Sequence, residues 1–191
     1  MRDRYVLPAA AEFAGKKYGI HGDFREILEI FSYLQDESLP ENLRWRIAVA
    51  LFYEEEIPGE ALPEALNFLA DFIAGGETAP SGGGAKLLDW EQDANLIVAE
   101  INRVSHQEIR ALPFLHWWTF LGWFHGIGQG QLSTLVSVRD KLRRGKKLED
   151  WEREFYRQNK QRVDMKKAFS PEELRQRQEL EAMLNKRKEG S

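Results

Sequence analysis

The sequence predicts a mainly α-helical protein with a small N-terminal β-hairpin. Apolar residues recur at helical intervals in several segments of the chain. Capping patterns precede two of these segments, and glycines follow some of them. The 191 residues are 42% hydrophobic and 30% charged, which is typical of a globular chain. We expect two helical units joined by a glycine-rich linker and followed by a charged C-terminal helix. The predicted parts are residues 1–74, the linker 75–86, residues 87–164 and the tail 165–191.

The first unit is predicted to begin with the hairpin. Gly15 separates two short segments of alternating apolar residues within residues 13–20, which is typical of paired strands. Asp23 and Glu26 then form a capping-box pattern, and apolar residues at helical spacing follow them. We expect this first helix to end near Asp36.

Two further helices complete the predicted first unit. Pro40 can occupy the first turn of the second helix, in which Leu43, Ile47 and Leu51 share one face. The third helix is followed by Gly75 and Gly76. Its apolar positions are Leu62, Leu66, Leu69, Phe72 and Ile73.

Residues 75–86, which read GGETAPSGGGAK, are predicted to be a flexible linker. They contain five glycines, one proline and almost no side chain that could be buried. Beyond them, Asp89 and Gln92 form a second capping pattern. It begins an apolar stripe at helical spacing, made of Trp90, Ala94, Ile97, Ile101 and Val104.

The centre of the second unit is expected to be residues 114–124, FLHWWTFLGWF, which are apolar on every side of a helix. Residues 126–130, GIGQG, interrupt this helix. They follow a helix rather than a strand and lack the Walker lysine. We therefore interpret them as a break between two helices and not as a phosphate-binding loop. A further helix and a short one follow, and a capped, charged helix is expected after Ser170.

No constellation of residues predicts an enzyme, a metal site or a bound cofactor. The sequence has no cysteine and four histidines. His116 and His125 are nine residues apart, which would place them on opposite faces of one helix. Asp89, Glu91 and Asp93 stand at a predicted helix start, where capping explains carboxylates better than acid–base chemistry does.

Charge is distributed unevenly along the chain, whose net charge is −4. Residues 1–86 include 8 basic and 15 acidic residues, whereas residues 87–191 include 19 basic and 16 acidic residues. This asymmetry could let neighbouring copies attract each other, so a homo-oligomer is one expectation. Residues 139–167 hold 12 basic and 6 acidic residues with interspersed aromatics, which leaves nucleic-acid binding as an alternative to a salt-bridged or protein-binding helix face.

The sequence favours a cytoplasmic protein that does not enter a membrane. The N-terminus lacks the apolar region of a secretory signal. The most apolar stretch, residues 111–128, contains Pro113, three glycines and two histidines within a length below that of a bilayer span. A helix buried in the protein core explains this stretch better than a membrane span does.

The aromatic residues are the candidates for contact with a protein partner. An aromatic-rich helix is most often core, but any aromatic surface left uncovered would mark a binding site. The candidates are Trp90, Trp117, Trp118, Phe120, Trp123, Trp151 and Phe155.

Several segments, taken in order, resemble the small tail proteins of Gram-positive siphophages and prophages that are encoded between the major tail protein and the tape-measure protein. They are Asp23-Phe24-Arg25-Glu26-Ile27-Leu28, Leu51-Phe52-Tyr53, Ile57-Pro58, Leu88-Asp89-Trp90-Glu91-Gln92-Asp93-Ala94, His116-Trp117-Trp118-Thr119-Phe120 and residues 139–156.

The resemblance implies a non-enzymatic tail-assembly chaperone acting in the host bacterial cytoplasm. Its partner would be the long, helical tape-measure protein, with the major tail protein as a second candidate. No catalytic residues are carried over from the family. A helical nucleic-acid-binding phage protein and a minor structural component of the tail remain the alternatives.

Overall fold

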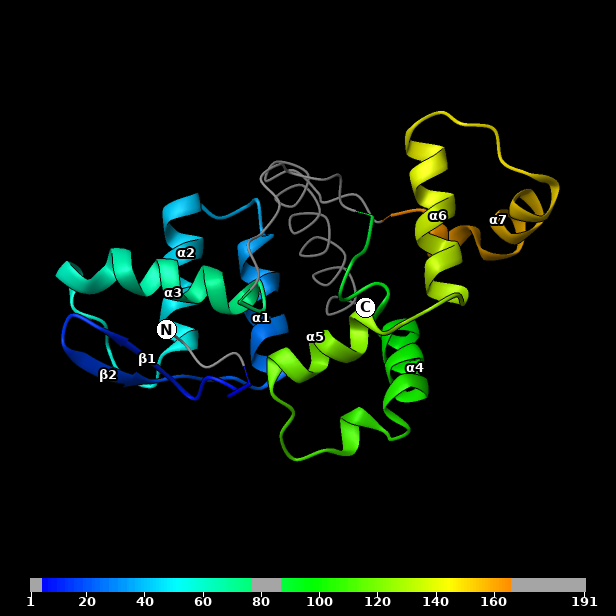
Figure 1. Cartoon of the computed structure of the whole chain (residues 1–191). Helices are drawn as coiled ribbons and strands as arrows, with labels where there is room; N and C mark the ends of the chain where they lie inside the picture. Colours follow the sequence, from blue (N-terminus) through cyan, green and yellow to red (C-terminus); the bar gives the residue numbers. More distant parts are fainter. Residues whose placement is uncertain (1–4, 77–86, 166–191) are drawn as a thin grey trace, which may run out of the picture.

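A computed structural model describes residues 5–76 and 87–165, and it confirms the mainly helical fold with an N-terminal hairpin (Figure 1). Strands β1 and β2 and helices α1 to α3 occupy one side of the molecule, and α4 to α7 the other. The elements are β1 (Ala10–Phe13), β2 (Lys16–Gly19), α1 (Phe24–Leu34), α2 (Glu41–Phe52), η1 (Gly59–Ala61), α3 (Leu62–Ile73), α4 (Ala94–Ser105), η2 (Ile109–Ala111), α5 (Trp117–His125), α6 (Gln131–Arg143) and α7 (Asp150–Val163).

The hairpin forms where the alternating pattern predicted it. β1 and β2 pair antiparallel, with Ala11 opposite Tyr18, and Ala14 and Gly15 make the turn with φ values of 50° and 70°. Two consecutive positive φ values give the twist that suits a two-residue hairpin turn. The Phe13 ring stacks on Tyr18 at 4.6 Å between centroids. One buried face of the hairpin therefore joins the core.

Helix α1 begins at the predicted capping box. The Arg25 amide donates to the Asp23 carboxylate at 2.9 Å, and the Asp23 amide donates to Glu26 at 3.3 Å. These bonds satisfy amides that have no partner within a helix. The helix ends at Leu34, slightly before the expected end near Asp36.

Helices α2 and α3 complete the first group of helices. Pro40 lies just before the first residue of α2, not in its first turn, and its carbonyl accepts from the Leu43 and Arg44 amides. The buried Tyr53 hydroxyl, directly after α2, donates to the Ala65 carbonyl of α3 at 2.8 Å. This bond fixes the end of α2 against α3.

Two helices of the second group start later than the sequence predicted. Trp90 precedes α4 in a turn, because the Asp89 carboxylate accepts from the Glu91 and Gln92 amides at 3.1 and 2.8 Å. Helix α5 starts at Trp117 and not at residue 114, because the His116 Nδ1 accepts from the Trp118 amide at 3.1 Å and caps the helix. Side-chain capping thus sets both starts.

The glycine-rich segment before α6 holds a carboxylate from another helix. Glu100 of α4 accepts from the Gln131 amide at 3.1 Å, at the start of α6. A Cβ atom at Gly130 would lie 2.5 Å from the Glu100 Oε1, so glycine permits this close approach. The position that a phosphate would take at this helix start is occupied by the chain's own carboxylate.

Helix α7 has 14 residues and is longer than the short helix that the sequence predicted. The helix expected after Ser170 lies outside the described residues, as does most of the predicted linker. Among the described helices, none is long and apolar enough to cross a bilayer.

Residues from both predicted units share one core. The indole N–H groups of Trp117 and Trp118 donate to the carbonyls of Ile73 and Phe72, each at 2.9 Å. The Leu115 amide donates to the Asp23 carboxylate at 2.8 Å. The segments 1–74 and 87–164 therefore pack directly against each other, and their division into two units stays a prediction.

A buried ion pair holds the second group of helices together. The Arg139 guanidinium of α6 donates to both oxygens of Asp93, at 2.6 and 2.9 Å, with both side chains almost fully buried. It also donates to the carbonyls of Leu87, Arg162 and Val163. Arg139 thereby joins the start of α4, the residues before it and the end of α7, and its donors are satisfied as burial requires.

Candidate protein-binding surface

The structure divides the seven aromatic candidates between the core and the surface. Trp117 and Phe120 are each 1% exposed, so their rings face the protein interior. Trp151 of α7 is 59% exposed. The half-buried members are Trp90, Trp118, Trp123 and Phe155.

Trp90, Trp117 and Phe120 come together in one aromatic cluster. The Trp90 centroid lies 6.1 Å from those of Trp117 and Phe120, and Phe24 of α1 stacks on Phe120 at 4.8 Å. Such packing contributes to stability beyond the buried area alone. These three residues hold α1 against α5, and this leaves Trp151 as the most exposed of the seven candidates.

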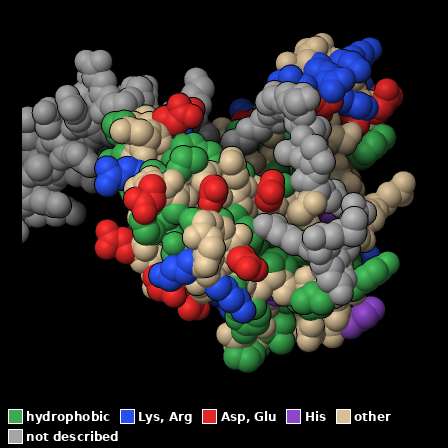
Figure 2. Space-filling model, turned by 60° about the vertical axis from the view of Figure 1, so that its left-hand side comes forward, with side chains coloured by type: hydrophobic (Ala, Val, Ile, Leu, Met, Phe, Trp, Pro, Cys, Tyr) green, Lys and Arg blue, Asp and Glu red, His purple; other side chains and the backbone are tan. Residues whose placement is uncertain are grey.

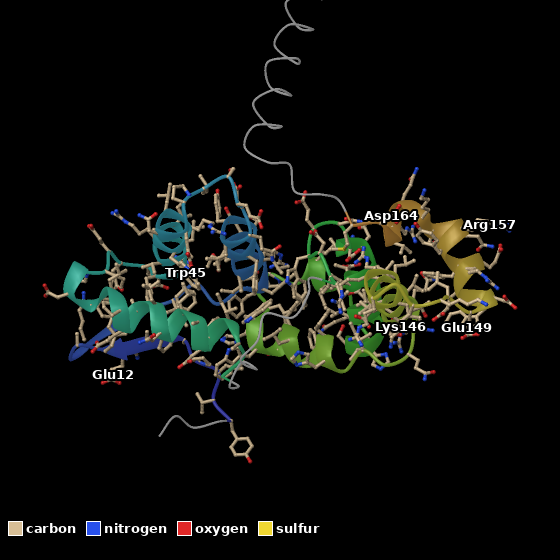
Figure 3. The ribbon with its side chains drawn as sticks, turned by 90° about the horizontal axis from the view of Figure 1, so that it is seen from above. Glu12, Trp45, Lys146, Glu149, Arg157 and Asp164 are labelled. Atoms are coloured by element: carbon tan, nitrogen blue, oxygen red, sulfur yellow. The ribbon has the colours of Figure 1, made fainter. Side chains whose placement is uncertain are left out.

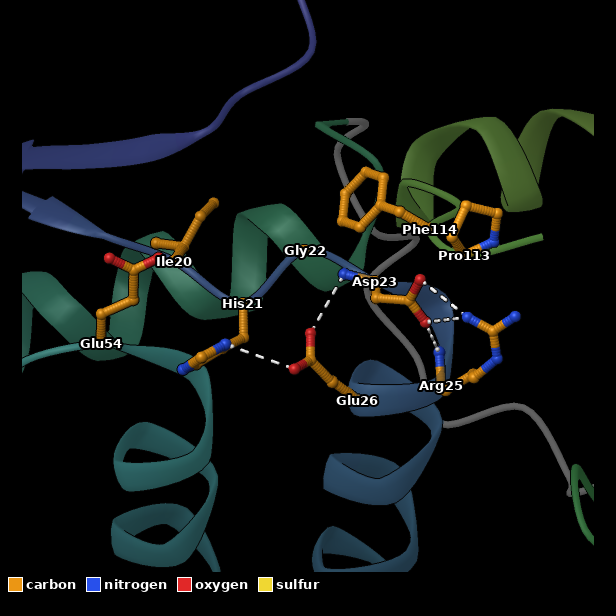
Figure 4. Close-up of a pocket in the computed structure, with 9 residues that line it drawn as sticks. All are labelled: Ile20, His21, Gly22, Asp23, Arg25, Glu26, Glu54, Pro113 and Phe114. Atoms are coloured by element: carbon orange, nitrogen blue, oxygen red, sulfur yellow. Dashed lines mark hydrogen bonds and ion pairs between the residues drawn. The ribbon is translucent and has the colours of Figure 1, made fainter.

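An open cleft of about 440 Å³ lies where β2 meets α1 (Figure 4). Residues 113–114, which precede α5, form its opposite wall. The cleft thus spans the contact between the two groups of helices. We call it the Phe114 cleft, and its lining residues are Ile20, His21, Gly22, Asp23, Arg25, Glu26, Glu54, Pro113 and Phe114.

Arg25 positions the wall that carries Phe114. Its guanidinium contacts both oxygens of Asp23 at 3.0 Å, and it donates to the carbonyls of Leu112 at 2.7 Å and Ile109 at 3.3 Å. The first residues of α1 therefore hold the segment before α5 by polar contacts across the cleft. This arrangement is partly exposed, so its charges are screened by water.

Carboxylates and an aromatic ring face the same opening. His21 Nδ1 lies 3.3 Å from Glu26, and Glu54 stands on the same side of the cleft in Figure 4. The Phe114 ring is 58% exposed. An exposed ring beside carboxylates fits a partner segment that carries apolar and basic side chains.

The N-terminal residues extend the exposed apolar surface near Phe114. The buried His116 ring lies 6.4 Å from the Phe114 ring, and its Nε2 is 3.1 Å from the Pro8 carbonyl. Val6 and Leu7, just before Pro8, are 60% and 47% exposed. Burial lowers the pKa of His116, while its contact with Pro8 acts in the opposite direction.

Sequence reasoning missed Phe114 as an exposed residue because it placed Phe114 inside the apolar helix. A signal was present: Pro113 directly precedes it, and the residues around a proline favour an extended chain. The pairing of Asp23 with Leu115, 92 residues away, has no signal in a single sequence. Tertiary packing alone brings the two walls together.

The basic segment suggested for nucleic acid is largely internally paired. Arg139 is buried against Asp93, and several exposed arginines contact acids one helical turn away. The other pairs are Lys141 with Glu152, Arg153 with Asp150 and Arg157 with Glu154. In the described ranges, no three His, Asp or Glu side chains group as metal ligands would.

Comparison with known proteins supports a phage origin. Residues 2–165 match the model of a family described as Bacteriophage Gp15 protein. No curated protein and no solved structure matches the chain. The phage origin that the resemblance implied is thus confirmed, whereas the role in tail assembly stays a proposal. Because the match covers most of the sequence, the chain belongs to the Bacteriophage Gp15 protein family.

Proposed function

We propose that this phage protein is a non-enzymatic tail-assembly chaperone that binds the tape-measure protein before the tail is complete. The observation that carries the proposal is the Phe114 cleft, in which an exposed ring stands beside carboxylates. A long helical partner with apolar stripes and basic side chains suits such a surface. The resemblance to tail proteins encoded beside the tape-measure protein supports this choice of partner.

Weak contacts would suffice for this role. A tape-measure protein presents many similar helical segments along its length, so many copies of a chaperone can bind it together. Apolar contacts are not screened by salt, whereas charge pairs at the cleft are. We therefore expect binding that moderate salt weakens only in part.

The test is co-expression with the cognate tape-measure protein, followed by a pull-down and an assay of solubility. Phe114→Ala should reduce the recovered partner several-fold, since exposed aromatic anchors often dominate an interface. Trp151→Ala is the matched control, because Trp151 is equally exposed but lies on α7. Equal recovery with all three proteins would show that the cleft is not the binding site.

The same pull-down separates the alternatives. A nucleic-acid binder with several phosphate contacts would lose orders of magnitude in affinity between about 50 and 200 mM salt, and nuclease treatment would remove its partner. A structural tail component would be retained in purified mature tails. Recovery of nucleic acid without tape-measure protein would contradict the proposal.

A further inference from the structure

A second hollow lies away from the Phe114 cleft, between α2 and α3. Its volume is about 400 Å³, and its apolar lining residues are Trp45, Leu62 and Leu66, all half-buried. Leu43, also on α2, is 41% exposed. We call this hollow the α2–α3 groove; Glu41, Asn42 and Arg46 complete its lining.

Acidic side chains surround the α2–α3 groove. Residues 36–73 contain nine acidic and two basic residues. Glu41, Glu60 and Glu64 are exposed on α2, η1 and α3, and they form no ion pair within the described part of the chain. Figure 2 shows acidic side chains spread over this side of the molecule with hydrophobic side chains between them. The groove therefore suits an apolar group accompanied by positive charge.

The connection between α6 and α7 offers a group of that kind. Leu142 is 39% exposed and Trp151 is 59% exposed, and the exposed Lys146 and Lys147 lie between them in the sequence. We call residues 142–151 the α6–α7 tip. Neither lysine forms an ion pair within the described part of the chain, unlike Arg143, Arg144, Arg153 and Arg157.

Hydrogen bonds and one buried side chain order the α6–α7 tip. Gly145 ends α6 with φ of +63°, and the Lys146 amide donates to the Lys141 carbonyl at 2.8 Å. Leu148 is buried, and Glu152 accepts both from Lys141 at 2.7 Å and from the Glu149 amide at 2.9 Å. A preorganised surface loses little conformational entropy on binding.

We propose that the α6–α7 tip of one copy docks into the α2–α3 groove of the next copy. Trp151 supplies the aromatic anchor, and Lys146 and Lys147 face the carboxylates around the groove. The two surfaces lie in opposite halves of the molecule, as the labels of Trp45 and Lys146 show in Figure 3 and the helices in Figure 1. Contact between two different surfaces leaves one of each free, so copies add head to tail.

Sedimentation velocity over a range of protein concentrations tests this assembly. The wild-type protein should form oligomers that grow with concentration and dissociate as salt rises. Trp151→Ala combined with Lys147→Glu should weaken association about tenfold or more, as should Glu41→Lys combined with Glu64→Lys. All four positions are exposed, so circular dichroism should show unchanged folding. Phe114→Ala is the control and should assemble like wild type.

Mixing the two double variants gives the sharper test. Each retains one intact surface, so the mixture should form dimers and no larger species. A wild-type protein that stays monomeric at all concentrations would overturn the proposal, and so would a mixture that fails to pair. Loss of assembly with normal pull-down of the tape-measure protein would leave the proposed function intact.

Discussion

At the scale of single residues, His116 links three parts of the chain. Its Nδ1 accepts from the Trp118 amide at the start of α5, and its Nε2 approaches the Pro8 carbonyl. A neutral ring can accept at one nitrogen while it donates at the other, whereas a protonated ring can only donate. Protonation would therefore remove the cap of α5. The lowered pKa of His116, which burial causes, agrees with this requirement.

We predict that the protein loses stability as the pH falls below about 6.5, in part because of His116. The unfolded chain binds a proton on this histidine near its ordinary pKa of 6.5, whereas the native protein binds it more weakly. Below pH 6.5 the unfolded state thus holds more protons, and the free energy of unfolding decreases until the pH passes the native pKa. Urea unfolding at pH 7.5 and 5.5 measures this loss.

The matched variants are His116→Asn and His125→Asn. Asparagine can cap a helix but does not titrate in this range, so His116→Asn should show a smaller loss between the two pH values. His125 is exposed at the end of α5, and its replacement should leave the loss unchanged. An equal pH dependence in all three proteins would assign the effect to other groups.

At the scale of elements, local patterns predicted which helices exist better than where they begin. The Asp23 capping box and the glycine turn of the hairpin depend on neighbouring residues, and both are confirmed. The starts of α4 and α5 depend on turns made by Asp89 and His116, which helical periodicity does not reveal. The Phe114 cleft depends on contacts between distant segments, so the sequence could not predict it.

Trp118 of α5 packs against α3 and donates a hydrogen bond to it. We predict that Trp118→Ala lowers the free energy of unfolding by about 3 kcal/mol. The half-buried indole donates to the Phe72 carbonyl at 2.9 Å, and its ring lies 5.9 Å from the Phe72 ring. It also packs against Gly76, where a Cβ would come within 2.9 Å of the indole. Truncation removes this packing and one of the two hydrogen bonds that the Phe72 carbonyl accepts, the other coming from the Gly75 amide at 3.0 Å.

Urea unfolding measures this change, with Trp151→Ala as the control. Trp151 is 59% exposed, so its truncation should change the free energy of unfolding by less than about 0.5 kcal/mol. Both substitutions remove one indole from the fluorescence signal, which makes circular dichroism the better readout. Stability like that of wild type for Trp118→Ala would mean that its contact with Phe72 adds little.

At the scale of the whole molecule, a ring stack and two hydrogen bonds are among the contacts that join the two groups of helices. The Phe24 ring stacks on Phe120, the Asp23 carboxylate binds the Leu115 amide, and Trp117 donates to the Ile73 carbonyl. These residues lie close to the Phe114 cleft or beneath it. A change in how the groups pack would therefore change the proposed partner surface, which couples the stability of this contact to binding.

A shared core leads to the last prediction, that residues 5–76 and 87–165 unfold in one cooperative transition. Circular dichroism and tryptophan fluorescence should give the same urea midpoint, which is the behaviour of a two-state protein. Ile27→Ala provides the decisive variant, because Ile27 is fully buried in α1 and its truncation should cost about 2–5 kcal/mol. If the core is one unit, hydrogen exchange should speed up in α4 and α6 as well as in α1 to α3. Faster exchange confined to α1 to α3, with two separate unfolding midpoints, would instead establish two independently stable units that merely touch at the Phe114 cleft.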